Sequence, residues 1–313
     1  MGYISVAETA KKWNVSERTV RNYCAHDKIP GAFLTGKTWN IPDSAQKPMR
    51  QSVGEENRNL LTVLREEKKN GIKGGIYHKI QVDLTYNSNH IEGSRLTHEQ
   101  TCYIFETQSV DGAVFVNDVF ETANHFRCLD WVLDTISEPL SEEYVKQMHR
   151  ILKTGLMTQQ NPEAVIGDYK KYANVVGGIE TAKPGEVSAQ MAQLLQTYQN
   201  LQQPDFYEIA WFHMAFEKIH PFYDGNGRVG RLLLLKMCLE NDIVPFYINS
   251  ESKMFYYAGL KEWQTQGKPN RLLDVFLSMQ DDMKAVLDYF EIDYDHTETT
   301  ASTLAEQHKK WKL

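Results

Sequence analysis

Twelve consecutive residues, His220 to Arg231, combine the side-chain types needed to bind a polyphosphate and to move a proton. Gly225 and Gly227 lack a Cβ, so the backbone can curl and approach phosphate oxygens closely. His220 is the only residue of this run that can both lose and gain a proton near neutral pH. The run therefore predicts an anion-binding loop that contains one acid–base group.

Three charged side chains in the same run strengthen the prediction. Arg228 and Arg231 stand at positions i and i+3, so their guanidinium groups would lie on neighbouring faces of a first helical turn and could clamp a polyphosphate. Asp224 is a hard carboxylate that could hold Mg²⁺ against the same phosphates. Together they favour a nucleotide bound with Mg²⁺.

Two amphipathic helices would have to position this loop. Apolar residues lead up to it at positions i, i+3, i+7 and i+10, namely Ile209, Phe212, Phe216 and Ile219. Pro221 prevents that helix from continuing, and Leu232 to Leu235 begin a second, strongly apolar helix. The loop therefore opens onto the N-terminus of a buried helix, where unpaired N–H groups and the helix dipole favour an anion.

Other interpretations of these residues are possible. The Asp-Gly-Asn-Gly stretch alone is typical of an ordinary turn, with surface arginines and His220 as a helix cap. His213 lies seven residues before His220 and could share its helix face as a metal ligand, although a lone polar residue on a helix is the simpler interpretation. The sequence contains no GxxxxGK[ST], HExxH or GxSxG motif.

The run from His220 to Arg231 matches the pattern HPFx[DE]GNGRxxR at every specified position, and the sequence therefore resembles the Fic family. The resemblance implies a mainly α fold with a Fic-type helical core and a small β-hairpin flap. It also implies a protein adenylyltransferase, which transfers AMP from ATP to hydroxyl side chains of target proteins, itself included, with Mg²⁺ as cofactor. Relatives that transfer the terminal phosphate alter the GNGR part and lack the second arginine, and both features are intact here.

The resemblance also implies a role for most positions of the loop. His220 would be the general base for the target hydroxyl, and Asp224 the Mg²⁺ ligand. Arg231 would pair with the γ-phosphate, and Phe222 would fill the core beneath the loop. The α- and β-phosphates would be held by Gly225, Asn226 and Gly227, with Arg228 beside them.

A helix predicted over Ile76–Glu92 ends on a carboxylate, which is a poor position because the C-terminal end of the helix dipole repels negative charge. Glu92 should therefore have a cationic partner or point into water. The segment from Ser88 to Gly93 matches [ST]xxxE[GN], which resembles the inhibitory helix of the Fic class in which that helix precedes the core. The resemblance implies that Glu92 pairs with Arg231 and blocks the γ-phosphate. In some relatives the glutamate assists the removal of AMP, so a de-AMPylating enzyme is an alternative.

A hairpin is predicted within residues 165–184, around Gly177-Gly178, where Gly and β-branched residues are frequent. By its position it resembles the Fic flap, which aligns the target as an added strand. Val175, Val176 and Gly177 would form this flap. Lys170 stands where many relatives have Arg. An ordinary surface hairpin is the alternative.

Residues 3–42 resemble a winged helix-turn-helix of the MerR or excisionase type. We predict helices over Val6–Trp13 and about Glu17–His26, then a hairpin around Thr35-Gly36. In such modules the second helix enters the major groove and the wing contacts phosphate. DNA would be contacted by Arg18, Arg21, Asn22 and Lys37. A spacer or protein-interaction domain is the alternative, and specific DNA binding with so few contacts would need a homo-oligomer.

Charge and composition are consistent with two domains. Residues 1–48 carry a net charge of +3, which leaves −10 for the rest of the 313-residue chain. We assign 1–48 to the helix-turn-helix, 49–56 to a linker, 57–292 to the Fic domain and 293–313 to a polar tail. Four scattered cysteines, no long apolar run and no basic, apolar leader predict a cytoplasmic protein without a membrane partner. The alternative from another functional class is a transcriptional regulator whose Fic fold senses nucleotide.

Overall fold

The computed structural model describes residues 2–13, 15, 17–25, 28–47, 59–156 and 165–309, except for the side chains of Arg18 and Asn22. The chain divides into two compact units. The first comprises Met1–Asn59 and Lys284–Thr297, and the second Leu60–Met283 and Glu298–Leu313. The linker predicted at 49–56 lies outside the described residues.

The first unit contains two helices and a small antiparallel sheet of strand order β1-β3-β2. Its elements are β1 (Tyr3–Ile4), α1 (Val6–Trp13), α2 (Glu17–Ala25), β2 (Phe33–Thr35) and β3 (Thr38–Pro42). In the hairpin Leu34 pairs with Trp39, and Ile4 of β1 pairs with Ile41 on the other side of β3. Strand β1 was not predicted, because two residues carry no periodic signal and only pairing with β3 defines them.

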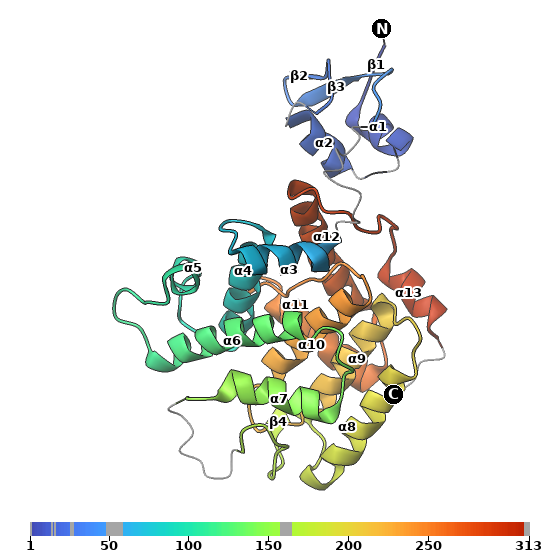
Figure 1. The fold of residues 1–313 in the computed structure, drawn as a ribbon. Helices are drawn as coiled ribbons and strands as arrows, with labels where there is room; N and C mark the ends of the chain where they lie inside the picture. The colour runs from blue at the N-terminus through green and yellow to red at the C-terminus, as the bar shows by residue number, and fades with distance from the viewer. Residues whose placement is uncertain are drawn as a thin grey trace. The chain divides into compact units, whose positions relative to one another are not determined.

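The second unit is mainly α, which confirms the predicted fold class (Figure 1). Its first helices are α3 (Leu60–Asn70), α4 (Ile76–Ile91), α5 (His98–Thr107), α6 (Val116–Asp134) and α7 (Glu142–Lys153). A two-stranded sheet, β4 (Val175–Val176) and β5 (Ile179–Glu180), follows them. The remaining helices are α8 (Pro184–Gln199), α9 (Phe206–Ile219), α10 (Asn226–Glu240), α11 (Lys253–Gln266), α12 (Asn270–Tyr289, which extends into the first unit) and α13 (Ala301–Gln307).

Helix α10 lies in the interior of the second unit and positions the predicted loop. It packs against α9 and also contacts α4, α6 and α7 (Figure 1). Leu232 to Leu235 are all buried, as the apolar run predicts, and each buried leucine side chain contributes about 1.5–3 kcal/mol. Because the helix is anchored by this burial, its N-terminus is held in one place beneath the loop.

Helix α5 was not predicted, because the segment His98–Thr107 has no helical period of apolar residues. Its start nevertheless carries a capping box that the sequence could have revealed. Thr97 Oγ1 accepts a hydrogen bond from the Gln100 N–H, and the Gln100 side chain accepts one from the Thr97 N–H.

Among the described helices, none combines the length and the apolar character needed to cross a membrane.

Candidate active site

His220 ends helix α9 in a left-handed backbone conformation, with φ 51° and ψ 62°. Its N–H still donates to Phe216 O at 2.9 Å, so the residue is attached to the helix but turned out of it. A left-handed non-glycine residue costs about 1–3 kcal/mol and is concentrated at functional sites. Pro221 follows and cannot extend the helix. The result is the helix–loop–helix that the sequence predicts.

The loop between the helices is braced by Asn226. Its Nδ2 donates to Phe222 O at 2.9 Å, and its Oδ1 accepts from the Phe222 N–H at 2.7 Å. The amide therefore braces the backbone of the loop that is predicted to hold phosphate. Gly225, at φ 84°, adopts the left-handed turn that starts α10, where its first N–H groups have no intrahelical partner.

His149 of α7 supports the loop from below, and sequence reasoning missed it because no motif marks it. Its ring stacks on Phe222 with centroids 3.9 Å apart and an interplanar angle of 5°. Its Nδ1 accepts from the Gly167 N–H at 2.9 Å, so the Nε2–H must donate to Asp224 O at 3.0 Å. Burial lowers the pKa of His149 to about 4, which keeps the ring neutral and this tautomer in place.

Asp224 lies in a network of charges that joins α6, α7 and α10. Lys153 Nζ donates to Asp224 Oδ2 at 2.6 Å and lies 3.4 Å from Glu121 Oε1. Arg228 Nη1 pairs with the same Glu121 oxygen at 2.7 Å. Although desolvation opposes it, the Lys153 ammonium holds the pKa of Asp224 below its usual value. Sequence reasoning predicted neither Lys153 nor Glu121 in the site.

The surroundings of Asp224 fit the Mg²⁺ ion that the resemblance implies. The carboxylate is 60% exposed beside the N-terminus of α10, and Mg²⁺ in proteins is held by one or two carboxylates together with substrate phosphates. Lys153 neutralises that carboxylate in the present arrangement. The Lys153 contact is with Asp224 Oδ2, and Oδ1 accepts from the Gly225 N–H at 2.6 Å.

Arg231 is buried and makes three contacts with the end of α4. Its Nε donates to Ser88 Oγ at 3.0 Å, and its Nη2 donates to Ser88 O at 2.9 Å and to Glu92 Oε1 at 2.7 Å. Burial raises the pKa of Glu92, but the Arg231 guanidinium outweighs burial and holds the pKa below its usual value. Glu92 thus has the cationic partner that its position at a helix C-terminus calls for.

Gly227 allows this carboxylate to approach the first turn of α10. A Cβ at position 227 would collide with Glu92 Oε1. Gly93, at φ 100°, lets the chain leave α4 in a conformation that residues with a Cβ disfavour. The Glu92 carboxylate therefore lies at a helix N-terminus, which is a position that stabilises anions.

The imidazole of His220 is neutral at physiological pH. Burial, together with the charge of Lys170, lowers its pKa to about 4. Its Nδ1 lies 3.9 Å from Glu217 Oε2 and makes no hydrogen bond within the described residues. A neutral ring with a free nitrogen can accept a proton.

The predicted flap segment is attached to the His220–Arg231 loop through Lys170. Its main-chain N–H donates to Pro221 O at 2.8 Å, and its Nζ donates to Asn174 Oδ1 and Thr181 Oγ1 at 2.8 and 2.6 Å. Val175 of β4 is 63% exposed. Within the described residues β4 and β5 pair only with each other, so an edge is open to an added strand.

Comparison with known proteins agrees with this site. The sequence model of the Fic/DOC family matches residues 139–238. This segment of the chain is therefore similar to the Fic/DOC family. The chain is 26% identical over 236 residues to the protein adenylyltransferase Fic of Drosophila grimshawi. The aligned region covers 72% of this chain and 46% of that protein. For the Drosophila willistoni protein of the same name, identity is 27% over 223 residues, or 69% and 41% of the two chains. The chain thus spans less than half the length of these curated relatives.

Solved Fic structures share the fold of this chain. A Fic domain-containing signaling protein from Bacteroides thetaiotaomicron VPI-5482 has a TM-score of 0.55 at 23% identity, covering 79% of this chain and 92% of its own. Fic-1 from C. elegans has a TM-score of 0.55 at 21% identity, with 73% and 71% of the two chains covered. At these sequence identities the comparison shows a shared fold and nothing more specific.

The residues predicted to contact DNA all belong to the first unit. In the first unit Arg21 is exposed and pairs with Glu17 at 2.6 Å, and Lys37 is exposed in the hairpin. The side chains of Arg18 and Asn22 lie outside the described structure.

His213 is fully buried, with Nδ1 3.2 Å from Gly230 O and Nε2 2.7 Å from the Tyr256 hydroxyl. Both ring nitrogens are used, so the structural interpretation of His213 holds.

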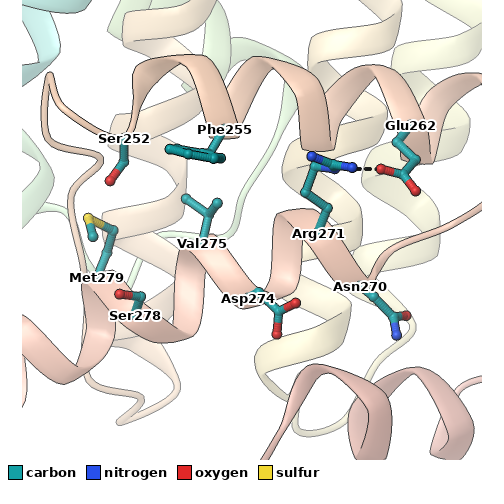
Figure 2. A pocket seen from close by; sticks show the side chains of 9 residues that line it. All are labelled: Ser252, Phe255, Glu262, Asn270, Arg271, Asp274, Val275, Ser278 and Met279. Atoms are coloured by element: carbon teal, nitrogen blue, oxygen red, sulfur yellow. Dashed lines mark hydrogen bonds and ion pairs between the residues drawn. The ribbon is translucent and has the colours of Figure 1, made fainter.

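A pocket of about 580 Å³ lies between α11 and α12, and none of its lining residues belongs to the Fic motif (Figure 2). Phe255 and Val275 face each other across it. Its arginine is already paired, with Arg271 Nε 2.6 Å from Glu262 Oε2. The residues predicted to bind phosphate therefore lie outside this pocket.

Proposed function

We propose that this protein transfers AMP from ATP to hydroxyl side chains of target proteins, itself included, and that Glu92 inhibits the transfer. The observation that carries the proposal is a neutral His220 in the loop that leads into α10, with Asp224 in the same loop and Arg231 near the start of α10. The match of residues 139–238 to the Fic/DOC family model and the relatives named protein adenylyltransferase support it.

In the proposed reaction His220 accepts the proton of the target hydroxyl. The hydroxyl oxygen forms a bond to the α-phosphorus, and the bond from that phosphorus to the oxygen bridging to the β-phosphate breaks, so pyrophosphate leaves. The main-chain N–H groups at Gly227 and Arg228 would stabilise the negative charge on the phosphates. Mg²⁺, held by Asp224, would supply further charge neutralisation when bound.

Inhibition follows from competition for Arg231 and for the first turn of α10. The Glu92 carboxylate binds the guanidinium and lies against Gly227. The γ-phosphate of ATP would have to displace the Glu92 carboxylate before it could bind the Arg231 guanidinium. ATP would then bind in an unproductive position until Glu92 moves away.

The reaction class is tested by the position of a radioactive label in ATP. Full-length protein carrying Glu92→Gly is incubated with Mg²⁺ and ATP labelled at either the α- or the γ-phosphate. We expect protein-bound label only from the α-phosphate, and pyrophosphate as product. Label from the γ-phosphate would show phosphoryl transfer instead. No label from either ATP, with ATP binding intact, would favour a nucleotide sensor.

Asp224→Asn should abolish most of the gain in ATP affinity that Mg²⁺ brings. One lost charged contact of about 1.5–3 kcal/mol corresponds to about 10- to 150-fold. Calorimetric titration with ATP, with and without Mg²⁺, measures this gain. The control is Asp111→Asn, an exposed carboxylate on a loop outside the site. An undiminished Mg²⁺ effect in Asp224→Asn would place the cation elsewhere.

We propose further that the first unit binds DNA, in the manner of a winged helix-turn-helix. The arrangement of α1, α2 and the β2–β3 hairpin supports this, as does the exposure of Arg21 and Lys37. The Arg21–Glu17 pair is 56% and 47% exposed, so it is weak enough to exchange for a phosphate contact.

Arg21→Glu with Lys37→Glu in the full-length protein should reduce binding to genomic DNA fragments and leave AMP transfer unchanged. Each lost phosphate contact lowers the slope of log affinity against log salt by about 1. Gel shifts at several salt concentrations measure both quantities. Lys261→Glu, an exposed charge reversal on α11, is the control. Equal DNA binding by the double variant and the control would refute this proposal.

A further inference from the structure

Glu217 places a carboxyl group in the interior directly behind His220. The two side chains are one helical turn apart at the end of α9, with exposed fractions of 10% and 14%. Glu217 Oε2 lies 3.9 Å from His220 Nδ1. Glu217 Oε1 and His220 Nδ1 are both buried and make no hydrogen bond within the described structure. A carboxyl oxygen and an imidazole nitrogen, which could form a hydrogen bond with each other, thus lie one helical turn apart without a partner in the described structure.

Gly230 makes the space that the carboxyl group occupies. A Cβ at this position would come within 2.5 Å of Glu217 Oε1 and 3.1 Å of the His213 ring. Gly230 stands at an unspecified position of the HPFx[DE]GNGRxxR pattern, so neither it nor Glu217 was singled out by the sequence. The packing of α10 against α9 creates this buried carboxyl site.

Charged and titratable groups reach Glu217 from three other elements. Burial raises its pKa to about 7, Arg231 of α10 opposes that rise, and Glu92 at the end of α4 adds to it. Tyr256 of α11 also lies within electrostatic range. Around His220 the charged groups are Lys170, Glu92 and Asp224, and the uncharged main-chain carbonyl of Glu217 also favours the protonated ring.

We propose that Glu217 is the positioning residue for His220, accepting the Nδ1–H so that Nε2 is free to take the proton of the target hydroxyl. This inference rests on the proposed AMP transfer. A rotation of either side chain closes the 3.9 Å separation to a hydrogen bond, and catalytic hydrogen bonds in unliganded enzymes are often long. When the imidazole takes up the hydroxyl proton, the carboxylate balances the new positive charge.

The proposal has a consequence for pH dependence. A protonated Glu217 would donate to Nδ1 and leave the ring hydrogen on Nε2, which is the tautomer that cannot act as base. The ionised carboxylate is the active form, so transfer rises as pH rises through about 7. Titration of His220 itself, at about 4, lies well below that range.

The test compares Glu217 with Glu217→Gln in full-length protein that also carries Glu92→Gly. Because the loss of Glu92 lowers the pKa of Glu217, we expect kcat with Glu217 to rise about tenfold per pH unit up to a midpoint below pH 7 and then level off. The Glu217→Gln variant should give a flat profile with a plateau at least about tenfold lower, and an unchanged KM for ATP. Glu251→Gln, an exposed carboxylate, is the control and should keep the rising profile. A rising profile in Glu217→Gln would overturn the proposal and leave the main-chain carbonyl as the group that orients the ring.

A second measurement separates this inference from the proposed function. NMR of ¹⁵N-labelled histidine reports the tautomer of His220 without any turnover. We expect the Nδ1–H form at pH 8 and its loss at pH 6, with no such change in Glu217→Gln. If the tautomer of His220 changes in this way but no AMP is transferred, the proposed function alone is refuted. If AMP is transferred but the tautomer does not change, the role of Glu217 is refuted.

If Glu217→Gln does not fold, Gly230→Ala provides a second variant, because the added Cβ displaces the carboxylate. Gly230→Ala should move the pH midpoint of the tautomer change, and an unmoved midpoint would refute the proposal.

Discussion

Replacing His220 with alanine is expected to lower AMP transfer by about 10²–10⁴-fold, the usual contribution of one positioned general base. ATP binding should change little, because the imidazole acts on the incoming hydroxyl. The pKa of about 4 means that the ring is neutral throughout the physiological range and already able to accept a proton. Single-turnover rates and the Kd for ATP, measured in the Glu92→Gly background, separate the two effects.

The control for this prediction is His296→Ala, which removes an exposed histidine outside the motif. It should leave both quantities unchanged. If His220→Ala kept the full transfer rate, the base would be another group. A parallel loss of ATP affinity would instead indicate that the left-handed turn at position 220 is needed to hold the loop.

Glu92→Gly is expected to raise AMP transfer by about 5- to 150-fold, which corresponds to the release of about 1–3 kcal/mol. The carboxylate is only 29% exposed, and it contacts Arg231 at the N-terminus of α10, where an anion is stabilised. Removing it frees both the guanidinium and the helix terminus for phosphate. Incorporation of label from the α-phosphate of ATP, at saturating Mg²⁺, measures the change.

Two variants make the Glu92 result specific. Ser88→Ala removes one of the hydrogen bonds that Arg231 donates, at 3.0 Å, but leaves the charge pair, so it should raise transfer less. Glu92→Gly combined with His220→Ala should be inactive, because the gain depends on the same site. Equal transfer by the wild type and Glu92→Gly, with a verified target, would mean that the pair with Arg231 does not inhibit.

Helix boundaries could be predicted where their signals are local. The helices predicted over Val6–Trp13 and Ile76–Glu92 agree with α1 and α4 within one residue, and Pro221 marks the break between α9 and α10. Elements without a period of apolar residues were missed. Helix α5 begins with a capping box but lacks an apolar stripe, and β1 exists only through its pairing with β3.

The twelve residues of the motif are contiguous, so the sequence by itself determined that a loop with the side chains of a phosphate site precedes a buried helix. The helix dipole also indicated that Glu92 needs a cation or water. Only the tertiary structure decided the contacts made between distant segments. These include Lys153 on Asp224, His149 beneath Phe222, and Gly230 making room for Glu217. Such contacts depend on how α7, α9 and α10 pack side by side, and that packing leaves no periodic trace in the residues of any one helix.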